Sequence, residues 1–202
     1  MKKRCILIRH AKTKGNEEKR YIGAKSDEDL SKSGIDETVK IKDDILRLVT
    51  DRTRVFASPM KRAIQTAQIL FENESISIID DLRETDFGLF EGKTYLELKD
   101  DHAYQLFLSS GAISGFPEGE KTEDFIKRSV EGFFEAINKS KDDDLVIVCH
   151  GGNIMAVMSS LTRTDFYDFH ADNLDGYILE FKTDGKRVFD LTYDRIGKRI
   201  SS

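Results

Sequence analysis

The chain has 202 residues, of which 39% are hydrophobic and 34% charged, a balance that predicts a soluble globular protein with one domain over residues 1–202. Its net charge of −5 argues against a nucleic-acid-binding protein, which needs a basic face. No apolar run approaches the roughly 18 residues of a membrane span, so no membrane association is expected. The run Cys5–Ile8 is too short for a signal peptide, and Cys5 and Cys149 lie in apolar runs as buried thiols do, which together favour a cytoplasmic location.

In chain order, buried strands alternate with amphipathic helices. Cys5–Ile8 predicts the first strand, and Ser33 with Gly34 marks the start of a helix whose apolar residues repeat at helical spacing over 35–49. Pro59 begins a further helix to about residue 71, because proline is tolerated in a first helical turn. The other strands are expected at 54–57, 76–79, 145–149, 177–181 and 188–193, and the other helices at 95–108, 122–138 and about 153–161.

This alternation predicts an α/β fold with a mainly parallel sheet. The last two strands flank a hairpin turn at 183–186 and are expected to add an antiparallel strand near one edge. The glycine-containing stretch 86–120 is interpreted as a helical excursion that serves as a substrate lid. Its aromatic residues are expected to be core, or in part to line an apolar pocket for a leaving group: Phe87, Phe90, Tyr95, Tyr104, Phe107 and Phe116.

Open parallel sheets bind ligands beyond the carboxyl ends of their strands, so the residues that follow each strand are the candidates for a site. Parallel strands bring these ends to one edge of the sheet, and two histidines, two arginines and a glutamate are therefore expected to converge there. The candidates are Arg9 and His10 after the first strand, Arg62 after the second, Glu84 after the third, and His150 with Gly151 after the fourth.

These residue types suit phosphoryl transfer. Guanidinium groups match phosphate oxygens and stay charged, and their charge disfavours protonation of a nearby histidine. A neutral imidazole can attack phosphorus and hold the phosphoryl group covalently. A carboxylic acid beside it can protonate the leaving oxygen and then activate water. The glycines at 151 and 152 leave backbone amides open to an anion at a helix start.

Four blocks of this sequence, in the same order, resemble those of the histidine phosphatase superfamily, the phosphoglycerate-mutase-like proteins. Together they make a far more specific signal than any one of them alone. The blocks are Leu7-Ile-Arg-His-Ala-Lys-Thr13 with Asn16 after it, Ser58-Pro-Met-Lys-Arg-Ala-Ile-Gln-Thr66, Leu82-Arg-Glu-Thr-Asp-Phe-Gly-Leu-Phe-Glu-Gly92 and Val148-Cys-His-Gly-Gly152.

The resemblance implies a three-layer α/β/α fold and a phosphomonoesterase that forms a phosphohistidine on a small phosphate ester, with no cofactor. It implies that His10 accepts the phosphoryl group, that Glu84 is the proton donor and that His150 completes the catalytic set. The phosphate is expected to be bound by Arg9, Asn16, Arg62, His150 and Gly151.

Several alternatives stay open at this point. Asp86 or Glu91 can replace Glu84 as the acid, and Asn16 can instead cap a helix. His170 stands between two aspartates, but a metal is not expected, because arginines at the predicted site repel cations.

The motifs also fit more than one activity. A mutase of the phosphoglycerate type shares the chemistry up to the phosphohistidine, although family mutases are longer than this chain. A non-catalytic phospho-ligand domain would be expected to lack His10 or Glu84, and a protein phosphatase would need an open groove. Residues 84–95 and 117–125 are most similar to alpha-ribazole phosphatases, and a broad-specificity sugar-phosphate phosphatase is the alternative. The oligomeric state, a homodimer included, is left open.

Overall fold

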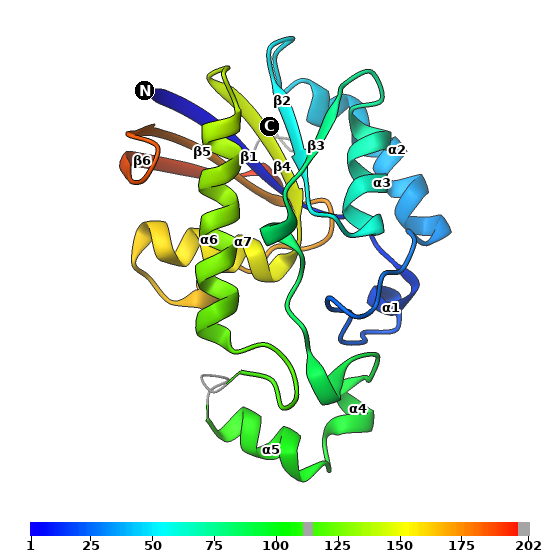
Figure 1. The fold of residues 1–202 in the computed structure, drawn as a ribbon. Helices are drawn as coiled ribbons and strands as arrows, with labels where there is room; N and C mark the ends of the chain where they lie inside the picture. Colours follow the sequence, from blue (N-terminus) through cyan, green and yellow to red (C-terminus); the bar gives the residue numbers. More distant parts are fainter. Residues whose placement is uncertain (111–114, 198–202) are drawn as a thin grey trace.

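The computed structural model describes residues 1–110 and 115–197, which contain one six-stranded sheet with the order β3-β2-β4-β1-β5-β6. β1, β2, β3 and β4 pair in parallel, whereas β5 is antiparallel to both β1 and β6 (Figure 1). The predicted mainly parallel sheet with antiparallel strands at one edge is therefore confirmed. The strands are β1 (Lys2–Arg9), β2 (Arg54–Ala57), β3 (Ile76–Ile78), β4 (Asp144–Cys149), β5 (Gly176–Thr183) and β6 (Val188–Arg195).

Helices connect the strands from β1 to β5, and a short turn joins β5 to β6. The α-helices are α1 (Lys14–Glu17), α2 (Lys32–Leu46), α3 (Lys61–Leu70), α4 (Tyr95–Leu98), α5 (His102–Ser109), α6 (Thr122–Lys139) and α7 (Gly151–Thr162). Three short 3-10 helices complete the described chain: η1 (Asp80–Leu82), η2 (Gly88–Phe90) and η3 (Phe166–Phe169). None of the helices in the described ranges is long and apolar enough to cross a membrane.

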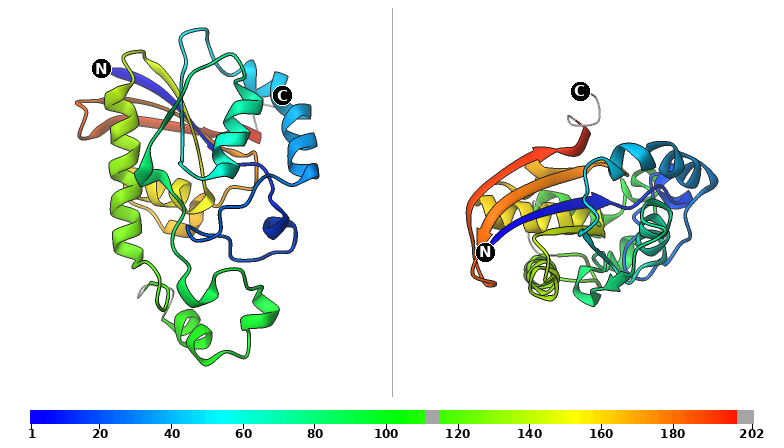
Figure 2. Two further views of the ribbon diagram at one scale, coloured as in Figure 1. Left: turned by 45° about the vertical axis from the view of Figure 1, so that its right-hand side comes forward. Right: turned by 90° about the horizontal axis from the view of Figure 1, so that it is seen from above.

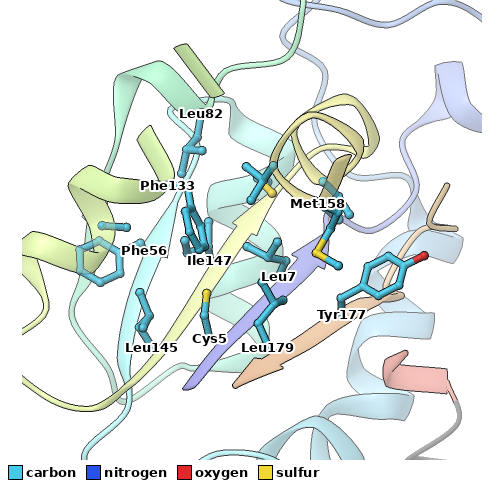
Figure 3. Packing of buried hydrophobic residues seen from close by; sticks show 14 of the residues in the cluster. Cys5, Leu7, Phe56, Leu82, Phe133, Leu145, Ile147, Met158, Tyr177 and Leu179 are labelled. Carbon is cyan, nitrogen blue, oxygen red and sulfur yellow. The ribbon is translucent and has the colours of Figure 1, made fainter. Parts of the chain in front are cut away.

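The sheet is covered on both faces, which gives the predicted three-layer α/β/α arrangement. Successive side chains of a strand point to opposite faces. Cys5 and Leu7 of β1 accordingly pack toward α6 and α7, where Figure 3 shows them on the side of Phe133 and Met158. Ile6 and Ile8 pack instead with residues of α2 and α3. Figure 2 shows α6 and α7 together on one side of the sheet.

The helix expected over 95–108 is wrong as a single element, because the structure divides it into α4 and α5. Asp101 breaks the continuity, since its side chain accepts a hydrogen bond from the Tyr104 amide and so begins a new helix. The helix expected from Asn153 begins two residues earlier, at Gly151, and the short helix α1 is not predicted by the periodicity.

The stretch 86–120 forms a small core of its own, away from the sheet (Figures 1 and 2). Phe90, Leu98, Tyr104 and Phe107 are buried in it, while Tyr95 is exposed. Residues 111–114 of the predicted excursion lie outside the described residues.

Candidate active site

The carboxyl ends of β1, β2 and β4 bring the first candidates together. The amide of His10 donates to the carbonyl of Cys149, and the amide of Ser58 donates to that of Val148, both at 2.9 Å. These bonds extend the sheet pairing just past the strands, so the residues that follow each strand lie side by side. The rings of His10 and His150 are 5.0 Å apart between centroids, although the two residues are far apart in sequence.

His10 is held in one tautomer. Its Nδ1 lies 2.7 Å from the carbonyl oxygen of Ala11. A carbonyl oxygen only accepts, so Nδ1 carries the proton and Nε2 keeps a lone pair. Burial, followed by the charges of Arg62 and Arg9, holds the pKa of His10 well below its ordinary value. The imidazole is therefore neutral at neutral pH, and the lone pair of its Nε2 is chemically able to attack phosphorus.

His150 has protein partners at both ring nitrogens. Arg62 Nε donates to its Nδ1 at 3.2 Å, so the ring proton is on Nε2, which lies 2.7 Å from Ser58 Oγ. Burial and then Arg62 keep the pKa of His150 well below its ordinary value. A contact between His150 and a phosphate therefore requires one of these two bonds to be exchanged.

The two arginines are held differently. Arg62 is fully buried, and its guanidinium donates to the backbone carbonyls of Ile22, Gly23 and Ser26 as well as to His150. Arg9 donates from Nη1 to Ala171, but its buried Nε has no hydrogen-bond partner.

The unpartnered Nε of Arg9 is available to donate a hydrogen bond to an anion. A buried donor without a partner is costly, and native structures contain few of them. A Cβ added to Gly151, the first residue of α7, would lie 3.5 Å from this nitrogen, so the amino end of α7 and Arg9 face the same point. A helix amino end and a guanidinium both favour a phosphate there.

Glu84 lies beside this point and is buried. Its Oε1 accepts from the Thr85 amide at 2.9 Å and its Oε2 from the Gly152 amide at 3.4 Å. An added Cβ on Gly152 would come within 2.4 Å of Oε1, so glycine is needed for this close approach. Burial raises the pKa of Glu84 above its ordinary value, although the Thr85 amide and Arg62 oppose the shift. A raised pKa keeps the carboxyl protonated further toward neutral pH, as a proton donor requires.

The two competing carboxylates have other contacts. Asp86 accepts from the Gly88 amide and forms an ion pair with Lys25 at 2.9 Å. Glu91 accepts from the amides of Gly23 and Phe87 and so fixes the loop that binds Arg62. These contacts favour Glu84 over both as the acid.

Asn16 takes part in capping helix α1, the alternative left open by the sequence, as the partner of the N-cap residue Thr13. Its side-chain oxygen accepts from the Thr13 amide at 3.2 Å in a capping box. The same oxygen lies 3.4 Å from Asn173 Nδ2, which also donates to the carbonyl of His10 at 2.8 Å. Asn16 is thus linked to His10 through Asn173, and no sequence motif indicates this role of Asn173.

Two more residues of the site were not predicted. Thr66 Oγ1 accepts a hydrogen bond from the Ala11 amide at 3.0 Å. Thr66 is the last residue of the second sequence block, and a polar residue on an apolar helix face could have indicated its role there. Arg128 donates to the backbone carbonyls of Arg83 and Glu84. The sequence does not predict this role, because an arginine on an amphipathic helix is ordinarily exposed. In the described ranges, no three His, Cys, Asp or Glu residues are grouped so as to hold a metal ion.

Residues 5–194 match the model of the histidine phosphatase superfamily, branch 1, and the chain belongs to this family. The resemblance seen in the sequence blocks and the predicted phosphatase class are thereby confirmed. The chain is 30% identical over 192 residues to the protein named "Putative phosphoserine phosphatase 2" of Hydrogenobacter thermophilus, with 92% of each chain covered.

Solved structures of this family have the same fold. Phosphoserine phosphatase from Entamoeba histolytica, in complex with 3-phosphoglyceric acid, superposes with a TM-score of 0.75 at 25% identity and covers 94% of this chain and 95% of its own. The alpha-ribazole phosphatase from Shigella flexneri gives a TM-score of 0.74 at 23% identity, covering 92% and 93%. The second similarity concerns the fold alone.

Proposed function

We propose that this chain hydrolyses a small phosphate monoester through a phosphohistidine on His10. The observation that carries the proposal is the buried, unpartnered Nε of Arg9 beside a neutral His10 whose Nε2 has a free lone pair. Arg62 supplies a second positive charge close to both histidines. Fixed positive charge of this kind stabilises the transferring phosphoryl group.

Two chemical steps follow from this arrangement. His10 Nε2 attacks phosphorus while the bond from phosphorus to the alcohol oxygen breaks, and Glu84 gives its proton to that oxygen. Water then attacks the phosphohistidine, the P–N bond breaks, and the Glu84 carboxylate takes the proton of the water. Inorganic phosphate leaves, and both residues return to their starting states.

The substrate has two named candidates. The relative named as a phosphoserine phosphatase supports phosphoserine, whereas the resemblance of residues 84–95 supports alpha-ribazole 5'-phosphate. We also propose that residues 86–110 and 115–120 contribute to one wall of the substrate site within a single domain. Cys5 and Cys149 are free buried thiols, which supports the proposed cytoplasmic location.

The proposal is tested by trapping the intermediate. The protein is mixed with a phosphate ester, quenched in alkaline denaturant and digested, and mass spectrometry should find one phosphoryl group on the peptide containing His10. His10→Ala should lose both this label and turnover, with an unchanged circular dichroism spectrum. If His10 is labelled but the protein converts 3-phosphoglycerate to 2-phosphoglycerate without releasing phosphate, the result would instead support a mutase. Turnover by His10→Ala within tenfold of wild type would exclude the phosphohistidine.

A further inference from the structure

A cavity of about 660 Å³ opens beside the proposed acid. Glu84, Thr85 and Gly152 form one part of its wall, at the place where a leaving oxygen would receive its proton. The rest of the described wall comes from Tyr21, from residues 87, 107, 108 and 116, from the first turns of α6 and α7, and from residues 165–167 at the start of η3. The volume lies within the range of small-molecule sites, about 300–1,000 Å³. Because the cavity meets the proposed acid, the alcohol part of a bound ester would lie in it.

The wall of this cavity is mainly aromatic. It includes Phe87, Phe107, Phe116, Phe125 and Phe166. Phe116 packs against Phe87 at 4.8 Å and against Phe107 at 4.7 Å between ring centroids, so part of the wall is a preformed aromatic cluster. Such a surface gains free energy by removing apolar area of a ligand from water.

The charged residues of the wall also bear on which alcohol part the cavity accepts. Among its described residues there is no lysine, arginine or histidine, and the only carboxylate besides Glu84 is that of Asp165. A carboxylate on the alcohol part would therefore enter a largely aromatic cavity with no cation to pair with it. Burying a charge without a partner is strongly unfavourable.

Resting on the proposed phosphatase function, we propose that this cavity selects phosphate esters whose alcohol part is uncharged and apolar, with an aromatic ring preferred. Alpha-ribazole 5'-phosphate meets two of these criteria, since its alcohol part carries no carboxylate and its ribose bears an aromatic base. Phosphoserine and phosphoglycerates lie outside this class, because each brings a carboxylate into the cavity.

Three esters that all release a primary alcohol test the proposal on the wild-type protein: 3-phenylpropyl phosphate, glycerol 3-phosphate and O-phospho-L-serine. The phenylpropyl ester has no electron-withdrawing substituent and gains nothing in intrinsic reactivity, so a preference for it reports binding of the ring. We expect its kcat/KM to exceed both others by about 10- to 150-fold, the value of burying one aromatic side chain. A kcat/KM for O-phospho-L-serine equal to or above that for the phenylpropyl ester would overturn the proposal.

A matched pair of substitutions on α5 tests whether this cavity is responsible for the substrate selectivity. Leu108 lines the cavity, whereas Leu106 is outside it, and the two residues are 46% and 56% exposed, so arginine is tolerated at either position. Leu108→Arg should lower the preference for phenylpropyl phosphate over O-phospho-L-serine at least tenfold, and Leu106→Arg should leave it within twofold. An unchanged preference in Leu108→Arg, or an equal change in both, would overturn the assignment. Failure of the wild type to hydrolyse any ester would instead contradict the proposed function.

Discussion

Arg128 of α6 links the loop that carries Glu84 to Glu120, at the end of the segment 86–120. Its guanidinium donates to Glu120 at 2.6 and 2.7 Å, and to the backbone carbonyls of Asp81, Arg83 and Glu84 at 2.8, 2.6 and 3.0 Å. The side chains of Arg128 and Glu120 are only 9% and 16% exposed. Arg128→Met keeps most of the side-chain volume and removes all these donors.

The expected loss of stability follows from these contacts. Breaking a buried ion pair by removing one partner costs about 3–5 kcal/mol, because the other charge is left uncompensated. Carbonyls left without a donor cost about 1–3 kcal/mol each when fully buried, but this loop can admit water, so we take the ion-pair range as the total. At about 2–4 °C per kcal/mol for a chain of this size, Tm should fall by about 6–20 °C.

The assay combines urea unfolding with kinetics. Glu120→Gln should destabilise less than Arg128→Met, and the double variant should be less destabilised than the sum by about 1–3 kcal/mol, since the two groups interact directly. Because Arg128 positions Glu84, kcat/KM for an alkyl phosphate should fall about 10- to 100-fold, and that for 4-nitrophenyl phosphate less than threefold. A loss of stability below about 1 kcal/mol, or an equal fall for both esters, would refute the reasoning.

Further predictions concern Glu84 and the arginines. Glu84→Gln should give a burst of nitrophenol near one equivalent from 4-nitrophenyl phosphate, followed by slow turnover. The phenolate leaves without an acid, but hydrolysis of the phosphohistidine still needs a base. Equal slowing of both steps without a burst would contradict this prediction. The pKa of Glu84 is raised by burial, so kcat/KM for an alkyl phosphate should fall as pH rises through that pKa, and stopped assays across pH should find no such limb in Glu84→Gln. The same shift has a consequence for stability: protonation of Glu84 stabilises the fold below the pKa of the unfolded chain, and this contribution is lost as pH rises through the folded pKa. The Tm of Glu84→Gln should therefore rise relative to that of wild type as the pH is raised from the ordinary glutamate pKa of 4.5 through the raised pKa of the folded state, and a constant difference would show that the pKa is not raised. Dialysis against a chelator should leave phosphate release unchanged, since Arg9 and Arg62 supply the positive charge; activity lost on dialysis and restored by a divalent cation would contradict it.

The sequence by itself determined the type of fold and most of the site. Short apolar runs such as Leu145–Cys149 have few alternatives to a buried parallel strand, and Arg9, His10 and His150 follow such runs directly. Because parallel strands end at one edge of a sheet, their convergence follows from position alone. The apolar spacing over 95–108 did not reveal that two helices lie there in succession. The capping hydrogen bond of Asp101 begins the second of them and so divides the expected helix.

The tertiary structure decided how these groups are held. Asn173 reaches the His10 carbonyl across 163 positions of sequence, and Arg128 reaches the Glu84 carbonyl across 44. The separation of Glu84 from Asp86 and Glu91 as the acid also depends on which backbone amides each carboxylate meets. Hydrogen bonds and burial act over a few ångströms between residues that the chain brings together only on folding. The tautomer of His10 and the raised pKa of Glu84 therefore belong to the folded arrangement, and no periodicity or motif encodes them.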